Sequence, residues 1–569
     1  MTRAMTRAGL ALALLVTACA PPADGPPYDV LLTGGAIVDG TGNPRYRGDV
    51  ALAGDRIVAI GQVPPGDARR VIDVTGLVVA PGFIDMLGWS EVRLLADGRA
   101  LSKVTQGITT EVTGEGISVG PQTDATFAED SAYRASIGVT ATWRDIAAYF
   151  AELERRGTAI NLATFVGATQ VRKVVLGNAD RAPTAAELAR MTALVDTAMR
   201  EGAVGLSTSL VYAPAFYATT GELIALARAA AARGGVYATH LRDEGARIDE
   251  ALDEAFRIGT EARIPVELWH LKRAGRANWG DMARVLAKID SARAAGLDVA
   301  ANVYPYPASA TSLDASIPQW AHAGGTDSLL ARLGDPVQRA RIRRDMENPP
   351  DGAESFFRGA GGASGVLVAS VLADSLKYLE GKTLAEIAAQ WRRDPIDALF
   401  DLVRKDRSET GAIYFSMSED DVRTAAVHWW VSFCTDYGAV APDGPLSRSG
   451  VHPRVYGSFP RVLARYVRDE RRLALEQAVR KMTSLPAQRV GLTDRGLLRT
   501  GFAADVVVFD PRTIIDRATF ERPHQLAEGV RWVIVNGVVV FDDGAMTDAR
   551  PGRGLRGPGW TGRQERNRS

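Results

Sequence analysis

The sequence predicts an α/β protein: a TIM-like (β/α)8 barrel, a small β-domain and an inserted lid. Short apolar strands alternate with helical patterns over about four hundred residues in the middle of the chain, as in the βα units of a parallel sheet. Both ends of the chain instead contain short strands separated by turn residues. The simplest account is one small β-domain built from residues 28–80 and 496–556, with the barrel at 81–495 between them.

Eight barrel strands are expected, the number that closes a barrel of this type. They are Val78–Met86, Ile108–Thr113, Ala163–Val166, Val204–Thr208, Val236–Thr239, Val266–Trp269, Val299–Tyr304 and Val431–Thr435. The gap before the last strand is too long for one connection, and part of it is rich in Gly and Pro. Residues 313–364 are therefore predicted to form a lid inserted before the last strand.

The N-terminus has the features of an export signal. Arg3 and Arg7 precede a short apolar run that ends in Val16-Thr17-Ala18-Cys19. This ending resembles a bacterial lipobox, which implies a signal peptide over 1–19, lipidation of Cys19 and a tether over 20–27; the alternative is an ordinary secretory signal with a chance cysteine. The expected location is the bacterial cell envelope, lipid-anchored and facing the periplasm. At the other end, residues 557–569 are predicted to be a disordered tail.

Charge and cysteine content exclude several classes of protein. Lys and Arg number 67, and so do Asp and Glu, so there is no general attraction to nucleic acid or to an anionic membrane. Two cysteines do not make a disulfide scaffold. The expected partner is a small-molecule substrate, with membrane contact only through the lipid anchor.

Two of the six histidines end consecutive predicted strands, His240 after Val236–Thr239 and His270 after Val266–Trp269. Consecutive strands of a parallel barrel are neighbours, and their carboxyl ends form the catalytic face. The two imidazoles should therefore lie side by side, which is half of a zinc site. The alternative is two unrelated polar residues at strand ends.

An ordered series of motifs resembles the amidohydrolase superfamily, specifically its D-aminoacylase (N-acyl-D-amino-acid deacylase) branch, over residues 28–556. The motifs are Ala80–Asp85, Gln106–Thr110, Tyr237–His240, His270–Lys272, Thr435–Asp436 and His452–Arg461, followed by Gly501–Asp505 and Val535–Gly537. The resemblance implies a hydrolase that removes the acyl group of N-acyl-D-amino acids by attack of a metal-bound hydroxide.

The chain departs from the family pattern at two metal-binding positions. After Asp85 the superfamily normally has His-x-His, but Leu87 and Trp89 stand there and bind no metal. The alternative is a slipped register with Asp85 or Glu91 as ligand. The family's cysteine ligand after the second strand is replaced by Glu115, with a turn residue as the other interpretation. The expected cofactor is zinc, one ion per chain, on Glu115, His240 and His270, because three protein ligands and a water suit a catalytic zinc.

The resemblance also implies roles around the substrate. Asp436 corresponds to the general base; the alternative is a loop residue or helix cap. Lys272 is the implied partner of the free carboxylate, and the hydroxyl donors beside it are Tyr306, Ser309 and Ser312. Arg454 is a second candidate cation, and a structural salt bridge is an equally good interpretation of it. Two other functions stay open: a dipeptidase or cyclic-amide hydrolase of the same superfamily, and an inactive binding protein of the envelope.

Overall fold

The computed structural model describes residues 27–447 and 450–562. Within these ranges no helix is both long and apolar enough to cross a membrane. The predicted signal peptide, its lipidation site Cys19 and most of the tether lie outside the described residues.

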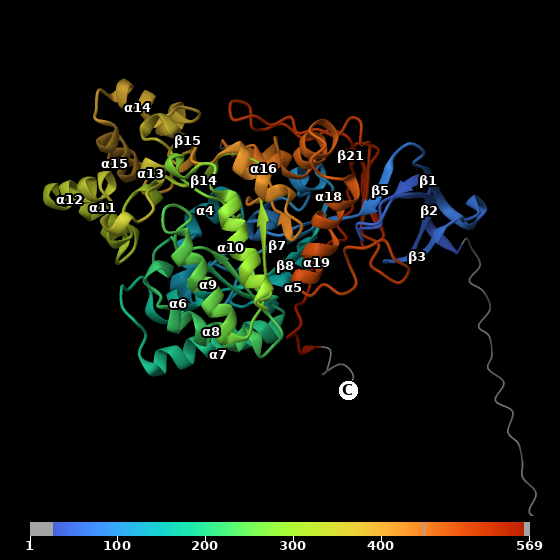
Figure 1. Ribbon diagram of the computed structural model, residues 1–569, viewed down its shortest axis with the longest axis horizontal. Coiled ribbons are helices and arrows are strands. Elements are labelled where there is room, and N and C mark those ends of the chain that lie inside the picture. The colour runs from blue at the N-terminus through green and yellow to red at the C-terminus, as the bar shows by residue number, and fades with distance from the viewer. Residues whose placement is uncertain (1–26, 448–449, 563–569) are drawn as a thin grey trace, which may run out of the picture.

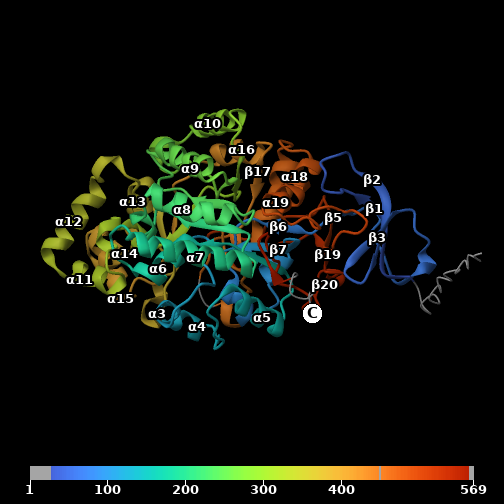
Figure 2. The same ribbon diagram turned by 90° about the horizontal axis from the view of Figure 1, so that it is seen from below.

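Parallel strands form a closed barrel in the middle of the molecule, with helices around it (Figures 1 and 2). The strands are β6 (Phe83–Asp85), β7 (Ile108–Thr113), β8 (Asn161–Thr164) continued by β9 (Val166–Gly167), β10 (Gly205–Ser209), β11 (Val236–His240), β12 (Val266–Leu268), β13 (Val299–Val303) and β17 (Val431–Phe433). They form two hydrogen-bonded runs, β6–β7–β8 and β9 to β17. Val204 N donates to Thr164 O (2.9 Å) and Asp436 N to Leu87 O (2.8 Å), which joins the runs on both sides. The predicted barrel is confirmed.

Helices cover the outside of the barrel because each has one apolar face. In α9, for example, Ile248, Leu252, Ala255 and Ile258 recur at helical spacing and are buried. The helices around the barrel are α1 (Glu91–Ala96), α2 (Leu101–Val104), α3 (Asp124–Glu129), α4 (Ser131–Ser136), α5 (Ile146–Arg156), α6 (Ala168–Leu176), α7 (Ala185–Glu201), α8 (Thr220–Ala231), α9 (Ile248–Ala262), α10 (Met282–Ala294), α16 (Glu419–Val427), α17 (Arg454–Arg461), α18 (Leu475–Met482) and α19 (Ser484–Arg489).

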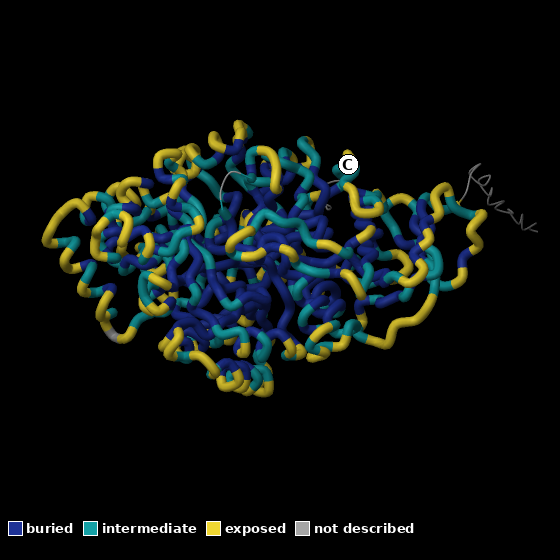
Figure 3. Tube along the Cα trace, turned by 90° about the horizontal axis from the view of Figure 1, so that it is seen from above, coloured by how far each residue is buried: buried dark blue, intermediate teal, exposed yellow. Residues whose placement is uncertain are grey.

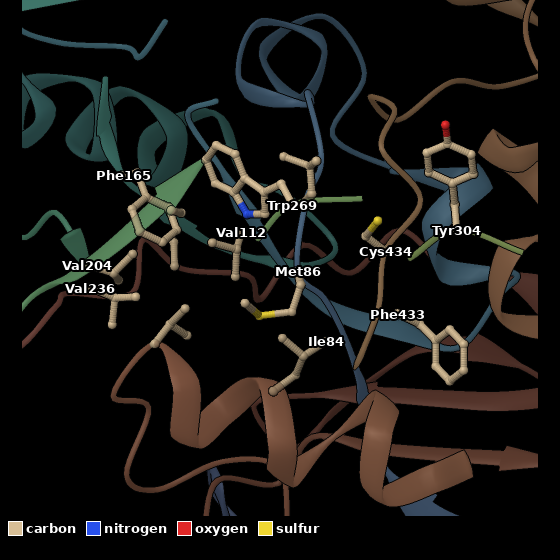
Figure 4. Packing of buried hydrophobic residues seen from close by; sticks show 14 of the residues in the cluster. Ile84, Met86, Val112, Phe165, Val204, Val236, Trp269, Tyr304, Phe433 and Cys434 are labelled. Atoms are coloured by element: carbon tan, nitrogen blue, oxygen red, sulfur yellow. The ribbon is translucent and has the colours of Figure 1, made fainter. Parts of the chain in front are cut away.

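The buried residues concentrate in the middle of the molecule, where the barrel lies (Figure 3). Side chains from several strands and from the residues next to them gather there, among them Ile84, Met86, Val112 and Phe165 (Figure 4). This apolar filling makes the barrel a packed core rather than a pore, and it leaves chemistry to the strand ends.

The two chain ends share one sheet, in the order β21–β20–β19–β18–β5–β1–β2–β3, with β4 beside β1. Its strands are β1 (Tyr28–Ile37), β2 (Tyr46–Ala53), β3 (Arg56–Gly61), β4 (Ala68–Asp73), β5 (Val78–Pro81), β18 (Val506–Phe509), β19 (Val530–Val535), β20 (Val538–Asp542) and β21 (Ala545–Met546). The predicted strand Val78–Met86 is therefore two strands, because β5 pairs with β18 in this sheet and β6 belongs to the barrel.

The insertion before the last barrel strand is larger than the predicted range 313–364. It contains a three-stranded sheet in the order β14–β16–β15 and five helices with a hydrophobic core of their own. Its elements are β14 (Ser309–Ser312), β15 (Val366–Ser370), β16 (Gly411–Tyr414), α11 (Thr326–Gly334), α12 (Pro336–Glu347), α13 (Phe356–Gly359), α14 (Leu384–Trp391) and α15 (Pro395–Lys405). Its helices α11–α15 and strands β1–β3 lie at opposite ends of the molecule (Figures 1 and 2).

The predicted disordered tail begins too early. Leu555 N donates to Leu162 O (2.7 Å) and Gly557 N to Gly202 O (2.9 Å), so the chain runs back along the barrel. Within the predicted tail, residues 557–562 belong to the described structure, and residues 563–569 lie outside it.

Candidate metal centre and substrate cavity

Glu115, His240 and His270 converge at the carboxyl ends of β7, β11 and β12. Glu115 Oε1 lies 2.9 Å from His240 Nδ1 and 3.3 Å from His270 Nε2. The two imidazole rings are 4.4 Å apart between centroids and nearly perpendicular. All three side chains are buried, and one ligand atom from each lies within 4.8 Å of the others. The structure therefore brings together the three predicted metal ligands.

The electrostatics of this group favour a cation. Burial raises the pKa of the Glu115 carboxyl, but hydrogen bonds from His240 and His270 outweigh it and lower that pKa to about 2. Burial lowers the pKa of His240, but the Glu244 and Glu115 carboxylates outweigh it and raise that pKa to about 10. A site that stabilises both a carboxylate and positive charge on its histidine suits a divalent ion with a His₂Glu ligand set.

Glu244 faces the outer nitrogens of both histidines. Its carboxylate oxygens lie 3.3 Å from His240 Nε2 and 3.2 Å from His270 Nδ1, and it accepts two hydrogen bonds from Lys272 Nζ (2.7 and 2.8 Å). Metal-binding histidines typically donate their second N–H to such a carboxylate, which fixes ring orientation. Glu244 was not among the predicted site residues, although its spacing of four from His240 was a usable signal.

Asp436 follows β17 and is held by one ion pair and one hydrogen bond. Arg454 Nη1 lies 2.8 Å from Asp436 Oδ2, and Trp89 Nε1 donates to Asp436 Oδ1 (3.3 Å). Asp436 and His270 both have positive φ, 48° and 37°, which is uncommon for residues other than glycine. Such strained residues cluster at functional sites, and here both end barrel strands.

One cavity of about 510 Å³ joins these groups. Its lining includes the three metal-ligand candidates, Glu244 and Asp436, and also Lys272, Ser309 and Arg454. Trp89, Tyr212, Tyr304 and Phe356 give it apolar surface. Its volume falls in the range of pockets that hold small organic molecules.

The chain is similar to curated relatives and solved structures over most of its length. It is 39% identical over 529 residues to the N-acyl-D-glutamate deacylase of Alcaligenes xylosoxydans xylosoxydans, covering 93% of this chain and 96% of the relative. The family model "Amidohydrolase family" matches residues 435–541. The chain belongs to the D-aminoacylase branch of the amidohydrolases.

Two solved structures of this branch superpose closely. One is a D-aminoacylase with a binuclear metal center, described by one-metal activation and second-metal attenuation. The two chains are 36% identical and superpose with a TM-score of 0.77, and the alignment covers 93% of this chain and 100% of the D-aminoacylase. The other is the N-acyl-D-glutamate deacylase of Bordetella bronchiseptica with zinc and a phosphonate inhibitor that mimics the tetrahedral intermediate. Its identity to this chain and its TM-score are also 36% and 0.77, and the alignment covers 93% of this chain and 99% of the deacylase.

The two positions of the missing His-x-His pair hold no metal ligand. Leu87 is buried and apolar, and the Trp89 indole points its N–H at Asp436. The alternative register is not supported, because Asp85 accepts a hydrogen bond from Lys103 Nζ (2.7 Å) rather than facing the cavity. Glu91 does line the cavity but is not part of the ligand group.

The hydroxyl donors implied by family resemblance divide into two groups. Ser309 lines the cavity. Tyr306 and Ser312 do not line it: Tyr306 Oη donates to Asp516 Oδ2 (3.1 Å), and Ser312 donates to the Asp314 carboxylate. Both hydroxyls bond carboxylates that do not line the cavity, so the arrangement gives no support to their predicted contact with substrate, which stays a prediction.

Proposed function

We propose that this protein is a metal-dependent deacylase of N-acyl-D-amino acids, with one zinc ion held by Glu115, His240 and His270. The observation that carries the proposal is the convergence of these ligands and Asp436 on one cavity, in a chain of the D-aminoacylase branch. One ion follows from the chemistry of Leu87 and Trp89, which offer no ligand atom to a second.

Each residue has a task that its position supports. Zinc, when bound, polarises a carbonyl group and makes water more acidic. The Asp436 carboxylate accepts the proton of the attacking water and returns it to the amide nitrogen, which leaves as the free amine. Arg454 and Trp89 orient Asp436 by binding one oxygen each. Glu244 orients the two histidines.

The free carboxylate of the substrate requires a cation at the cavity wall. Arg454 lines the cavity with its guanidinium 4.5 Å from the Tyr304 ring centroid, and its planar fork suits a carboxylate. Lys272 also lines the cavity and is paired with Glu244. Arg454, Lys272 and Ser309 are the proposed substrate-binding residues.

The rival functions make different demands. An inactive binding protein has no need for three ligands, a base and an orienting glutamate together. A dipeptidase or cyclic-amide hydrolase would use the same centre, so only substrate preference separates it from the deacylase.

The test is hydrolysis of N-acetyl-D-amino acids by the zinc-loaded protein, against their L-enantiomers, D-dipeptides and cyclic imides. We expect the D-series to be preferred, His240→Ala to lose metal and activity, and Asp436→Ala to lose activity with metal retained. His428→Ala is the matched histidine control, since His428 pairs with Asp290 and does not line the cavity. Full activity in either active-site variant would sink the proposal.

We also propose that Cys19 carries the lipid that anchors the mature protein on the periplasmic side. The support is the sequence Val16–Cys19 after a basic and apolar leader. Labelled fatty acid should appear in the protein expressed in a bacterial host and be absent from Cys19→Ser; equal labelling of both would contradict it.

A further inference from the structure

The insertion before the last barrel strand reaches the active centre where residues 353–356 lead into α13. Phe356 lines the substrate cavity, and its ring centroid lies 6.4 Å from that of Tyr212 with the two rings nearly parallel. Tyr212 in turn meets the His240 imidazole edge-on, with 5.2 Å between ring centroids. This segment is therefore part of the cavity wall. The proposed reaction gives Glu354, two residues before Phe356, no task.

Two reciprocal hydrogen bonds join Glu354 to the loop after β11. Glu244 N donates to Glu354 Oε2 (2.7 Å), and Glu354 N donates to Asp243 Oδ2 (2.9 Å). Glu244 and Glu354 are 110 positions apart in the chain. A Cβ atom at Gly245 would lie 3.6 Å from Glu354 Cγ, so the Glu354 side chain lies directly against this loop. The insertion is thus fastened to the barrel at the residue that orients both histidines.

Asp243 gives the insertion a fixed acceptor. Its Oδ1 accepts hydrogen bonds from Gly245 N (2.9 Å) and Arg247 N (3.0 Å), which leaves Oδ2 pointing at the insertion. The carboxylate that receives Glu354 N is therefore held in place by its own loop. Both bonds of the reciprocal pair end on groups of one short segment, residues 243–247.

The backbone of Glu244 is fixed on both sides. Its N–H is bound by Glu354, and its carbonyl oxygen accepts from Ala274 N (2.7 Å) in the loop after β12. The Glu244 carboxylate between them faces the outer nitrogens of both histidines and pairs with Lys272. Because outer partners of metal-binding histidines control metal affinity, a shift of this backbone would change the metal centre.

The Glu354 carboxyl can accept a hydrogen bond without carrying charge. Burial, followed by the charges of Glu244 and Asp243, raises the pKa of Glu354 to about 8. At neutral pH the group is mostly protonated, and its carbonyl oxygen accepts from Glu244 N. A glutamine side chain has the same length and a carbonyl oxygen at the same place, so it can take over this hydrogen bond.

We propose that Glu354 is a positioning residue, through which the insertion holds Glu244, and with it the two histidines, in the geometry that binds zinc. This inference rests on the proposed function. The insertion then has two tasks at the active centre: it closes the cavity with Phe356 and organises the metal ligands through Glu354.

Zinc affinity of the metal-free protein, measured by competition with a chelating dye, tests this role independently of turnover. Loss of one hydrogen bond corresponds to about a 3- to 10-fold change in a binding constant. We expect Glu354→Ala to weaken zinc binding by that factor and to lower kcat for an N-acetyl-D-amino acid. Glu354→Gln should stay within about twofold of wild type, because it keeps the bond to Glu244 N. Glu354→Asp keeps the carboxyl group but is one methylene shorter, so it should behave like Glu354→Ala.

Two controls separate positioning from a general effect on the fold. Glu386→Ala removes a bond of the same kind elsewhere in the insertion, since Glu386 Oε2 accepts from Thr383 N (2.7 Å), and it should leave zinc affinity unchanged. In a Glu244→Ala background, Glu354→Ala should change zinc affinity by less than about twofold, because the residue through which it acts is already gone.

Three results would overturn the inference. One is a zinc affinity of Glu354→Ala within about twofold of wild type, and another is an equal loss in Glu354→Ala and Glu354→Gln. The third is an effect of Glu354→Ala that is undiminished in the Glu244→Ala background. In each case the wild type still binds zinc and hydrolyses its substrate, so the proposed function stands. A wild type that binds no zinc rejects both.

Discussion

The buried ammonium of Lys103 ties the first barrel strand to the loop that carries Asp436. Lys103 Nζ donates to Asp85 Oδ2, Thr435 Oγ1 and the Tyr437 carbonyl oxygen, each at 2.7 Å. The side chains of Lys103 and Asp85 are fully buried. Lys103→Met would leave two buried carboxylates without their counter-charge: Asp85, and Glu111, whose Oε1 lies 3.5 Å from Lys103 Nζ.

The loss in free energy of unfolding depends on the hydrogen bonds that Asp85 would keep in Lys103→Met. Removing one partner of a buried ion pair destabilises a protein by about 3–5 kcal/mol. Asp85 would retain hydrogen bonds from Thr435 N (2.8 Å) and Thr435 Oγ1 (2.6 Å), so we expect the lower end, about 3 kcal/mol. Asp85→Asn in the Lys103→Met background should recover part of that loss, because it removes the nearer of the two carboxylates that lost their counter-charge.

Urea unfolding followed by circular dichroism measures the effect, with Lys382→Met as control. The Lys382 side chain donates a hydrogen bond to the exposed Gln390 side chain (3.1 Å), and its replacement should change stability by less than about 0.5 kcal/mol. Two results would refute the reasoning: Lys103→Met within about 1 kcal/mol of wild type, or a double variant that is as unstable as the two single losses added together. Metal content should be unchanged in all of these variants, which also tests whether Asp85 is a ligand.

Two further predictions concern groups whose environment is unusual. Burial, and to a lesser extent the charge of Arg480, lowers the pKa of Lys481 from 10.5 to about 7. Between these pH values the unfolded chain therefore binds more protons than the folded protein, and the free energy of unfolding must rise with pH. Relative to Lys481→Met, the wild type should gain about 2 kcal/mol in free energy of unfolding from pH 7 to pH 9, and a constant difference would contradict this. A Cβ at Gly88 would lie 1.6 Å from Glu111 Oε1, so Gly88→Ala should lower stability by about 1–3 kcal/mol in urea unfolding. In the Glu111→Ala background the same Gly88→Ala change should cost much less, because the clashing carboxylate is gone. The control is Gly66→Ala, which meets no atom within 4 Å; equal effects at both glycines would refute the steric explanation.

Features encoded along one strand were predictable from the sequence. His240 and His270 end consecutive strands, and the geometry of a parallel barrel places consecutive strand ends together. The position of Glu115 came from the order of family motifs. The structure places all three within a few ångströms, as expected.

Features that depend on side chains from distant segments were not predictable. The strand expected at Val78–Met86 divides because β5 finds its partner β18 more than four hundred residues later. Tyr306 faces Asp516, which no local pattern connects to it. The Arg93 guanidinium lies 5.3 Å from the Tyr437 ring centroid, and these two segments meet only when the barrel closes.

The most direct test of the central claim is the zinc content of the protein expressed from residue 20 and purified without chelator. We expect about one ion per chain, lost in Glu115→Ala, His240→Ala and His270→Ala and kept in Asp436→Ala. Two ions per chain, or none after zinc is supplied, would contradict a single catalytic metal on Glu115, His240 and His270.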